Sequence, residues 1–252
     1  MTKKLLAQMN LGATAIGTGI NSSPKYSPLV KTRLCEITNK PFETSCDLVE
    51  ATQDTSTFVH VSGVLKATAT KVSKICNDLR LLSSGPRTGL NEINLPPMQA
   101  GSSIMPGKVN PVIPEVVNQV AFQVIGNDVT ISMASEGGQL QLNVFEPVIA
   151  YNLFQSISMM CNAFETLAFK CIDGITANER VCEDKVINSI GLVTALNPVI
   201  GYQNSTIVAK EALDKNRSVY DIVLEKELLT KIELDEFLKP ENMVQPRING
   251  FE

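Results

Sequence analysis

A seven-residue repeat of apolar side chains runs through residues 46–84 and constrains the fold more than any other feature of the sequence. One series is Phe58, Leu65, Val72 and Leu79, and a second, three residues later, is Val61, Thr68, Ile75 and Leu82. Only the threonine is not apolar. A strict seven-residue repeat is typical of a long helix that packs an apolar seam against other helices. The repeat therefore predicts a helical bundle. His60 lies one residue off the seam, where we expect a neutral, hydrogen-bonded side chain at a helix interface.

Two further long helices are expected downstream of this segment. Residues 111–135 form one of them, and the pair Gly137-Gly138 ends it. Residues 139–171 form the other, because their apolar positions recur on average close to every 3.6 residues, and Pro147 should kink it. Since strand signals are few, the predicted fold is all-α, with a bundle of long helices.

Composition and periodicity change near Asp173, which divides the chain into two expected domains. Residues 1–172 hold the long helices, and residues 173–252 are expected to form a small helical C-terminal domain. Short helices are predicted there, because the capping pattern Thr-x-x-Glu occurs at Thr176 and again at Thr230.

The N-terminal region is expected to be a short helical end over residues 1–16, followed by a turn. Ser27-Pro28 has the order of a helix start, so a helix is predicted from there to about Thr38. Glycines at positions 12, 17 and 19 indicate places where the backbone closely approaches either a neighbouring helix or a substrate, and we favour packing.

Charge and cysteine content exclude several classes of protein. The net charge is −4, with no basic run that would attract nucleic acid, and no apolar run approaches the roughly 20 residues of a membrane span. The six cysteines form no C-x-x-C pair, and a single His supplies little for a zinc site. We therefore expect no metal or cofactor, buried thiols, a cytoplasmic location, and a small-molecule substrate or self-association.

A loop rich in small residues, Gly101-Ser-Ser-Ile-Met-Pro-Gly-Lys-Val-Asn-Pro111, separates the first two long helices. Its glycines permit unusual backbone conformations, and its prolines prevent a helix from continuing through it. Ser102 and Ser103 give adjacent hydroxyls, while Lys108 and Asn110 give donors suited to a carboxylate or a phosphate. The loop is not a P-loop, because five residues separate its glycines and a valine follows the lysine. An ordinary polar turn is the alternative.

This loop resembles the signature of the fumarase/aspartase superfamily, whose members eliminate ammonia or water and release fumarate. The resemblance covers essentially the whole chain and includes Leu11–Asn21, Gly85–Leu95, Gln139–Pro147 and Gly174–Asn178. Within the superfamily, Leu90–Leu95, Gln99-Ala100 and Pro114–Gln119 are more similar to the aspartase branch than to fumarase.

The resemblance implies a homotetramer that acts on a dicarboxylate, L-aspartate, and gives fumarate. It implies that Ser102 is the general base and that Ser103, Lys108 and Asn110 hold carboxylate oxygens. It also implies a catalytic role for Glu115, although a carboxylate in the first turn of a helix equally suits the helix dipole. Similarly, Ser102 in a plain turn would cap the following helix.

The resemblance also places Met1 inside the family's central helical domain, so roughly the N-terminal half is expected to be missing. The family's active-site His, which pairs with the glutamate matching Glu115, goes with it, and His60 does not match that position. We therefore expect the chain to be inactive alone and to need a companion N-terminal chain. Fumarase activity, or a non-catalytic helical assembly module, are the alternatives.

Overall fold

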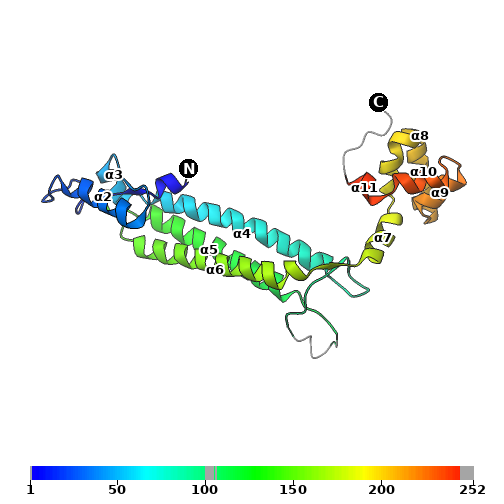
Figure 1. The fold of residues 1–252 in the computed structure, drawn as a ribbon, viewed down its shortest axis with the longest axis horizontal. Coiled ribbons are helices and arrows are strands. Elements are labelled where there is room, and N and C mark those ends of the chain that lie inside the picture. Colours follow the sequence, from blue (N-terminus) through cyan, green and yellow to red (C-terminus); the bar gives the residue numbers. More distant parts are fainter. Residues whose placement is uncertain (1, 100–104, 106, 245–252) are drawn as a thin grey trace. The chain divides into compact units, whose positions relative to one another are not determined.

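The computed structural model describes residues 2–99, 105 and 107–244, which divide into two compact units after Thr176. Both units are helical, and strands in the described chain are two-residue segments only (Figure 1). The prediction of an all-α fold is confirmed. The predicted domain boundary, after residue 172, lies a few residues before the division between the units.

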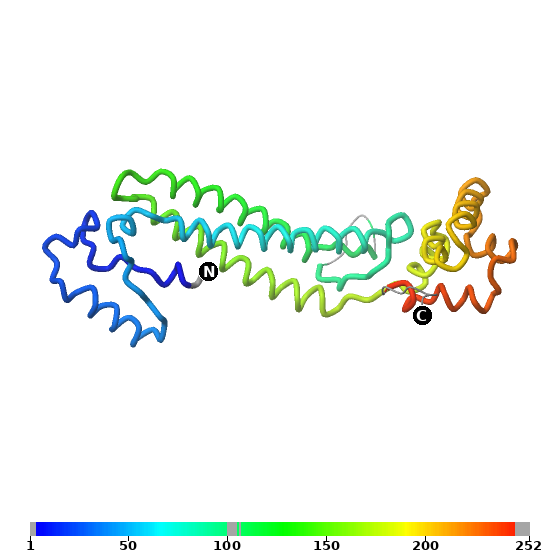
Figure 2. The backbone as a smooth tube through the Cα atoms, turned by 90° about the horizontal axis from the view of Figure 1, so that it is seen from above, coloured from blue at the N-terminus to red at the C-terminus, as the bar shows by residue number. Residues whose placement is uncertain are grey.

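Three long helices form the bundle of the first unit. They are α4 (Ser56–Leu82), α5 (Val112–Glu136) and α6 (Glu146–Lys170), and they run side by side in two perpendicular views (Figures 1 and 2). Helix α5 packs extensively against both neighbours, whereas α4 and α6 contact each other much less. The predicted long helices are therefore confirmed, with α5 as the central one.

The face that α4 buries differs from the predicted seam. Its buried side chains are small ones, Ser62, Ala69, Ser73 and Cys76, whereas Phe58 and Ile75 of the predicted seam are exposed. Leu65, Val72 and Leu79 are only partly buried. Small side chains let the backbones of α4 and α5 approach closely, and the larger side chains then pack along the edges of that contact. The predicted period was right, but the predicted face was wrong.

Polar contacts are buried within the interface between α4 and α5. Asp128 of α5 is 4% exposed; it accepts a hydrogen bond from the Ser62 hydroxyl (2.7 Å) and pairs with the Lys66 ammonium (2.5 Å). Apolar clusters lie at other levels of the bundle, where Ile131 of α5 packs with Ile149 of α6. A buried carboxylate is stable only when it is paired and hydrogen-bonded, so this contact fixes how the two helices face each other.

Helix α6 begins later than predicted, at Glu146, and Pro147 lies in its first turn rather than at a kink. Proline is favoured there because the first N–H groups of a helix have no partner within it. Between α5 and α6, Gln139 pairs with Leu142 in a tight turn. Asn143 is buried and donates to the carbonyl oxygen of Ala134 (3.0 Å).

The N-terminal part of this unit contains short elements. They are α1 (Thr2–Leu5), β1 (Gln8–Met9), α2 (Tyr26–Thr38), β2 (Glu43–Thr44) and α3 (Leu48–Gln53), with β1 and β2 paired in parallel. The predicted helix over residues 1–16 is wrong, because a strand and turns follow α1. The helix predicted to end near Thr38 is confirmed. Gly17 has φ +86° and packs against the backbone of α3, as its predicted role in packing requires.

The second unit has a core of its own. It comprises α7 (Glu179–Ile187), α8 (Leu192–Lys215), α9 (Val219–Glu225), α10 (Lys231–Phe237) and α11 (Pro240–Met243), and α8 is kinked at Gly201. Leu196, Val208 and Leu234 are among its buried core residues. The capping box at Thr230 is confirmed. The one predicted at Thr176 is wrong, because Thr176 lies in β4 (Thr176–Ala177) and Asn178 precedes α7.

We predict that Gly17→Ala destabilises the chain. The backbone at Gly17 is left-handed, and an added Cβ would overlap the backbone of Leu48 and Val49. The free energy of unfolding in urea should fall by at least about 1 kcal/mol. Gly63→Ala is the control, because a Cβ there meets nothing within 4 Å inside α4, and it should stabilise by about 0.5–1 kcal/mol. Equal effects of the two substitutions would contradict this account.

A second prediction concerns acid stability. Glu211 accepts hydrogen bonds from Lys215 and Lys226, which lower its pKa from 4.5 to about 2. Because the folded-state pKa is depressed, the stabilisation is present above pH 4.5 and is lost as the pH falls toward 2. In urea unfolding measured across that range, Glu211→Gln should reduce the acid dependence. Glu183→Gln, at an exposed position of α7, should leave it unchanged.

Candidate active site

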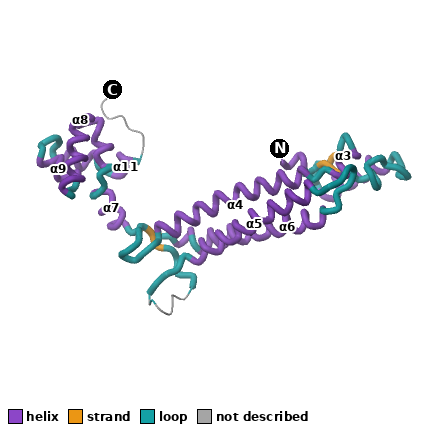
Figure 3. The backbone as a smooth tube through the Cα atoms, turned by 180° about the vertical axis from the view of Figure 1, so that it is seen from behind, coloured by secondary structure: helices purple, strands orange, loops and turns teal. Residues whose placement is uncertain are grey.

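The predicted active-site loop connects the end of α4 to the start of α5, so both ends of this connection lie at one end of the bundle (Figures 1 and 3). Ser102 and Ser103, the proposed base and one of the proposed carboxylate-binding residues, lie outside the described residues. Of the other three predicted site residues, Lys108 and Asn110 lie on the segment that leads into α5, and Glu115 lies in the first turn of α5.

The first part of the connection folds back onto the end of α4. The amide of Asn91 donates to the Ser84 carbonyl oxygen (2.7 Å), and that of Leu90 donates to the Ser84 hydroxyl (3.0 Å). A Cβ at Gly89 would overlap the Ser84 backbone, so only glycine fits there. Beyond this turn, β3 (Ile93–Asn94) pairs with β4, and Leu95 is buried in the apolar cluster of the adjacent helix ends.

Lys108 and Asn110 lie just before the first turn of α5, and both are half-buried. The Lys108 amide donates to the Met105 carbonyl oxygen (3.3 Å), and the Val112 amide donates to that of Asn110 (2.9 Å). Within the described ranges the Lys108 ammonium has no ion-pair partner. It therefore adds an unneutralised cation beside the positive end of a long helix, an arrangement that favours an anionic ligand.

Glu115 lies in the first turn of α5 and is half-buried. Its carboxylate makes no ion pair or hydrogen bond with any residue that the structure describes, while its amide donates to the Pro111 carbonyl oxygen (3.1 Å). Among the described residues, the favourable interaction of this carboxylate is therefore with the positive end of the α5 dipole. A second role for Glu115 requires a group from outside the described chain.

A polar cluster that the sequence analysis did not identify lies one turn further along α5. Asn118 is buried, and its carboxamide contacts Ser73, Asn77 and Arg80 of α4. A polar residue three positions after Glu115, on the side of α5 that faces α4, was the available signal.

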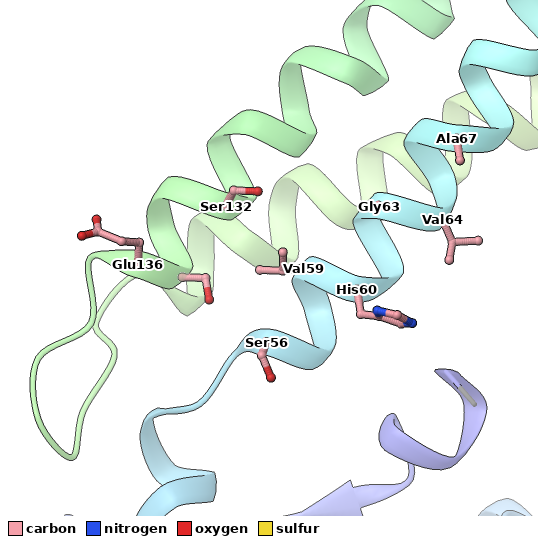
Figure 4. A pocket seen from close by; sticks show the side chains of 9 residues that line it. Ser56, Val59, His60, Gly63, Val64, Ala67, Ser132 and Glu136 are labelled. Carbon is pink, nitrogen blue, oxygen red and sulfur yellow. The ribbon is translucent and has the colours of Figure 1, made fainter.

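A groove of about 610 Å³ lies between α4 and α5 at the other end of the bundle (Figure 4). Its lining includes Ser56, His60, Gly63, Ser132 and Glu136, from the first turns of α4 and the last turns of α5. His60 is exposed and lacks a hydrogen-bond partner in the described part of the chain, so the prediction of a hydrogen-bonded interface His is wrong. The groove is separate from the loop and does not contribute to this site.

The cysteines are all free, but only two are buried, contrary to expectation. Cys76 and Cys171 lie in one apolar cluster at the loop end of the bundle, and burial raises the pKa of Cys76 to about 11. Such thiols stay protonated and inert near neutral pH. Among residues 2–99, 105 and 107–244, no group of three His, Cys, Asp or Glu side chains could hold a metal ion. In the same ranges, no helix is long and apolar enough to cross a membrane.

Two family models match the sequence. The one described as "Lyase" matches residues 1–126, and the one described as "Fumarase C C-terminus" matches residues 192–245. The chain is 66% identical to an aspartate ammonia-lyase of Helicobacter pylori, 60% to one of Pseudomonas aeruginosa and 59% to one of Escherichia coli. These matches cover 95%, 98% and 97% of the chain but 51%, 52% and 51% of the relatives. The chain thus spans about half the length of the curated relatives it matches.

Solved structures also match nearly the whole of this chain with about half of their own length. A fumarate lyase:delta crystallin from Brucella melitensis bound to cobalt matches with a TM-score of 0.92 and 51% identity, over 96% of this chain and 52% of that one. A class II fumarase from Schistosoma mansoni matches with a TM-score of 0.87 and 33% identity, over 96% and 55% of the two chains. The long-helix bundle is therefore shared with both kinds of lyase.

We predict that Glu115 contributes little to the stability of this chain. Because its carboxylate has no bonded partner among the described residues and meets the helix dipole, Glu115→Gln should lower the free energy of unfolding by less than about 1 kcal/mol. Asp128→Asn should cost more, about 1.5–3 kcal/mol, because Asp128 is buried and bound to Ser62 and Lys66. Urea unfolding of both variants measures the difference. A larger loss at Glu115 would show that its carboxylate is a structural element of the fold.

Proposed function

Because this chain belongs to the lyase family, we propose that it is part of an aspartate ammonia-lyase, which eliminates ammonia from L-aspartate to give fumarate. The observation that carries this proposal is the shared name of the close relatives over nearly the whole chain. A small dicarboxylate as substrate is compatible with the acidic composition of the chain, which has no basic run. It is also compatible with the half-buried cation of the loop, Lys108.

The reaction determines what the site must supply. A base removes a proton from the carbon beside the β-carboxylate, the electron pair forms the double bond of fumarate, and the carbon–nitrogen bond breaks to release ammonia. Since that carbon is weakly acidic, the charge that develops on the carboxylate oxygens must be stabilised by fixed donors. We assign the base to Ser102 and the donors to Ser103, Lys108 and Asn110. Backbone N–H groups beside glycines and the cation of Lys108 favour a deprotonated serine.

The donor side of this assignment is supported by the described residues. Lys108 pairs with no carboxylate in the part of the chain that the structure describes, and both it and Asn110 directly precede the N-terminus of the 25-residue helix α5. A dicarboxylate bound there would gain the Lys108 charge, the amide of Asn110 and the helix dipole together. We assign Glu115 to a proton-transfer pair whose second member lies outside this chain.

The site is proposed to be completed by other chains in a cytoplasmic homo-oligomer, and by a companion that supplies the part of the relatives' length that this chain does not match. Large apolar side chains remain exposed along α5 and α6 and support such association. They include Phe122, Val129, Met133, Tyr151, Phe154 and Phe169. On this proposal the chain alone is inactive.

Fumarase is the second candidate, favoured by the match of residues 192–245 to the fumarase C-terminal family and by the fumarase structure. A non-catalytic helical module is the third, favoured by the half-length match to the relatives. The three proposals differ in the product released, because the first gives ammonia, the second gives water from malate, and the third gives neither.

We predict that ammonia release from L-aspartate requires a mixture of this chain with the remaining half of the Helicobacter pylori relative. The relative's own two halves, mixed, are the positive control, and sedimentation of each active mixture measures its assembly. In the mixture, Ser102→Ala should lower kcat by about 10²–10⁴-fold. Ser158→Ala, at an exposed position of α6, should leave it unchanged.

Other outcomes select among the candidates. Conversion of malate without ammonia release would indicate fumarase. An inactive mixture beside an active control would indicate a non-catalytic module. Activity of the chain alone would contradict the need for a companion.

A further inference from the structure

One buried carboxamide joins the last turns of α4 to the first turns of α5. Asn118 is 3% exposed. Its nitrogen donates toward the Ser73 hydroxyl (2.8 Å), the Ser73 carbonyl oxygen (3.0 Å) and the Asn77 side-chain oxygen (3.1 Å). Its oxygen accepts from an Arg80 guanidinium nitrogen (3.3 Å). Since an amide has two N–H groups, three acceptors share two hydrogens, and both ends of this side chain are hydrogen-bonded to α4.

The three partners of Asn118 lie on one face of α4. Ser73, Asn77 and Arg80 are spaced by four and three residues, so they follow one another along the helix surface. All three fall in the last turns of α4, directly before the Ser84 turn. A rotation or a slide of α5 by one residue would remove the amide from all of these groups at once.

The active-site connection begins and ends at the two segments that Asn118 joins. It leaves α4 within about three turns of these partners, and it enters α5 through Lys108 and Asn110. Glu115 precedes Asn118 by three residues, about one helical turn, and so shares a side of α5 with it. The orientation of Glu115 and the path of Lys108 and Asn110 therefore depend on how α5 is set against α4.

We propose that Asn118 is a positioning residue of the active site, which sets the rotation of the first turns of α5 and thereby the placement of Glu115, Lys108 and Asn110. This inference rests on the proposed function for its catalytic consequence but not for its structural one. Apolar packing alone leaves such a setting loosely specified, because several rotations bury similar area. A buried amide that is hydrogen-bonded to three residues of α4 keeps those bonds at only one rotation of α5.

The same helix provides a matched control. Asn127 is also 3% exposed, and it joins α5 to α6 by donating to the Gln155 side-chain oxygen (3.1 Å) and the Ser156 hydroxyl (3.0 Å). It lies nine residues, about 13 Å, further from the loop. Replacing either amide by leucine removes a similar network at similar burial, but only one of the two networks borders the site.

The first test uses the isolated chain and needs no activity. The protein has no Trp, so Val109→Trp, at a 46% exposed position between Lys108 and Asn110, introduces a single fluorescent indole. Added to it, Asn118→Leu should lower the steady-state anisotropy and shift the emission of the indole. Asn127→Leu should change neither at a comparable free energy of unfolding. Equal responses of the two variants would overturn the proposal.

The second test uses the active mixture of the two halves. Asn118→Leu should lower kcat/KM by about 10–100-fold, as expected for misplaced reacting groups, while Asn127→Leu changes it by less than about threefold. Asn77→Ala, which removes one exposed acceptor, should give a smaller loss and covers the case in which Asn118→Leu does not fold. Equal kinetic losses at Asn118 and Asn127 would overturn the positioning role. An inactive mixture without substitutions would overturn the proposed function, while the fluorescence result still decides the inference.

Discussion

The close contact between α4 and α5 is the constraint on which the rest of the first unit depends. Small side chains of α4 allow this approach, and the buried Asp128, bound to Ser62 and Lys66, fixes which faces meet. The same contact holds Asn118 against the end of α4. Apolar clusters with residues from α4, α5 and α6 then fill the space among the three helices. The bundle therefore derives its cohesion from apolar burial and its geometry from a few polar groups.

The proposed site takes its geometry from that contact. Its described members, Lys108, Asn110 and Glu115, do not form a cluster held by bonds among themselves, and each is placed by the start of α5. The Lys108 ammonium is therefore not neutralised by Glu115, which suits Lys108 and Asn110 to bind an anionic ligand. Side chains that have no bonded partner among the described residues, and that are held at a rigid helix end, can interact with groups from further chains.

Sequence periodicity predicted the long helices and the all-α class, because both depend on local pattern. It failed where the outcome depends on contact between helices. The repeat of Phe58 and Leu65 indicated a seam of large side chains, whereas α4 buries Ser62 and Ala69. Pro147 was read as a kink because nothing in the local pattern shows that α6 begins beside it. Asn118 was missed for the same reason, since its partners lie about 40 positions away in sequence.

The polar contacts of helix α5 also restrict changes in the length of this helix. Its polar groups bind different neighbours at different heights, Asn118 and Asp128 toward α4 and Asn127 toward α6. A single inserted residue would turn everything beyond it by about 100° and shift it by about 1.5 Å, so the groups on the two sides of the insertion could no longer reach their partners together. Apolar positions of α5 can therefore vary in size, while its residue count between these anchors is fixed. Variation in length belongs instead to the turns at the two ends of the helix.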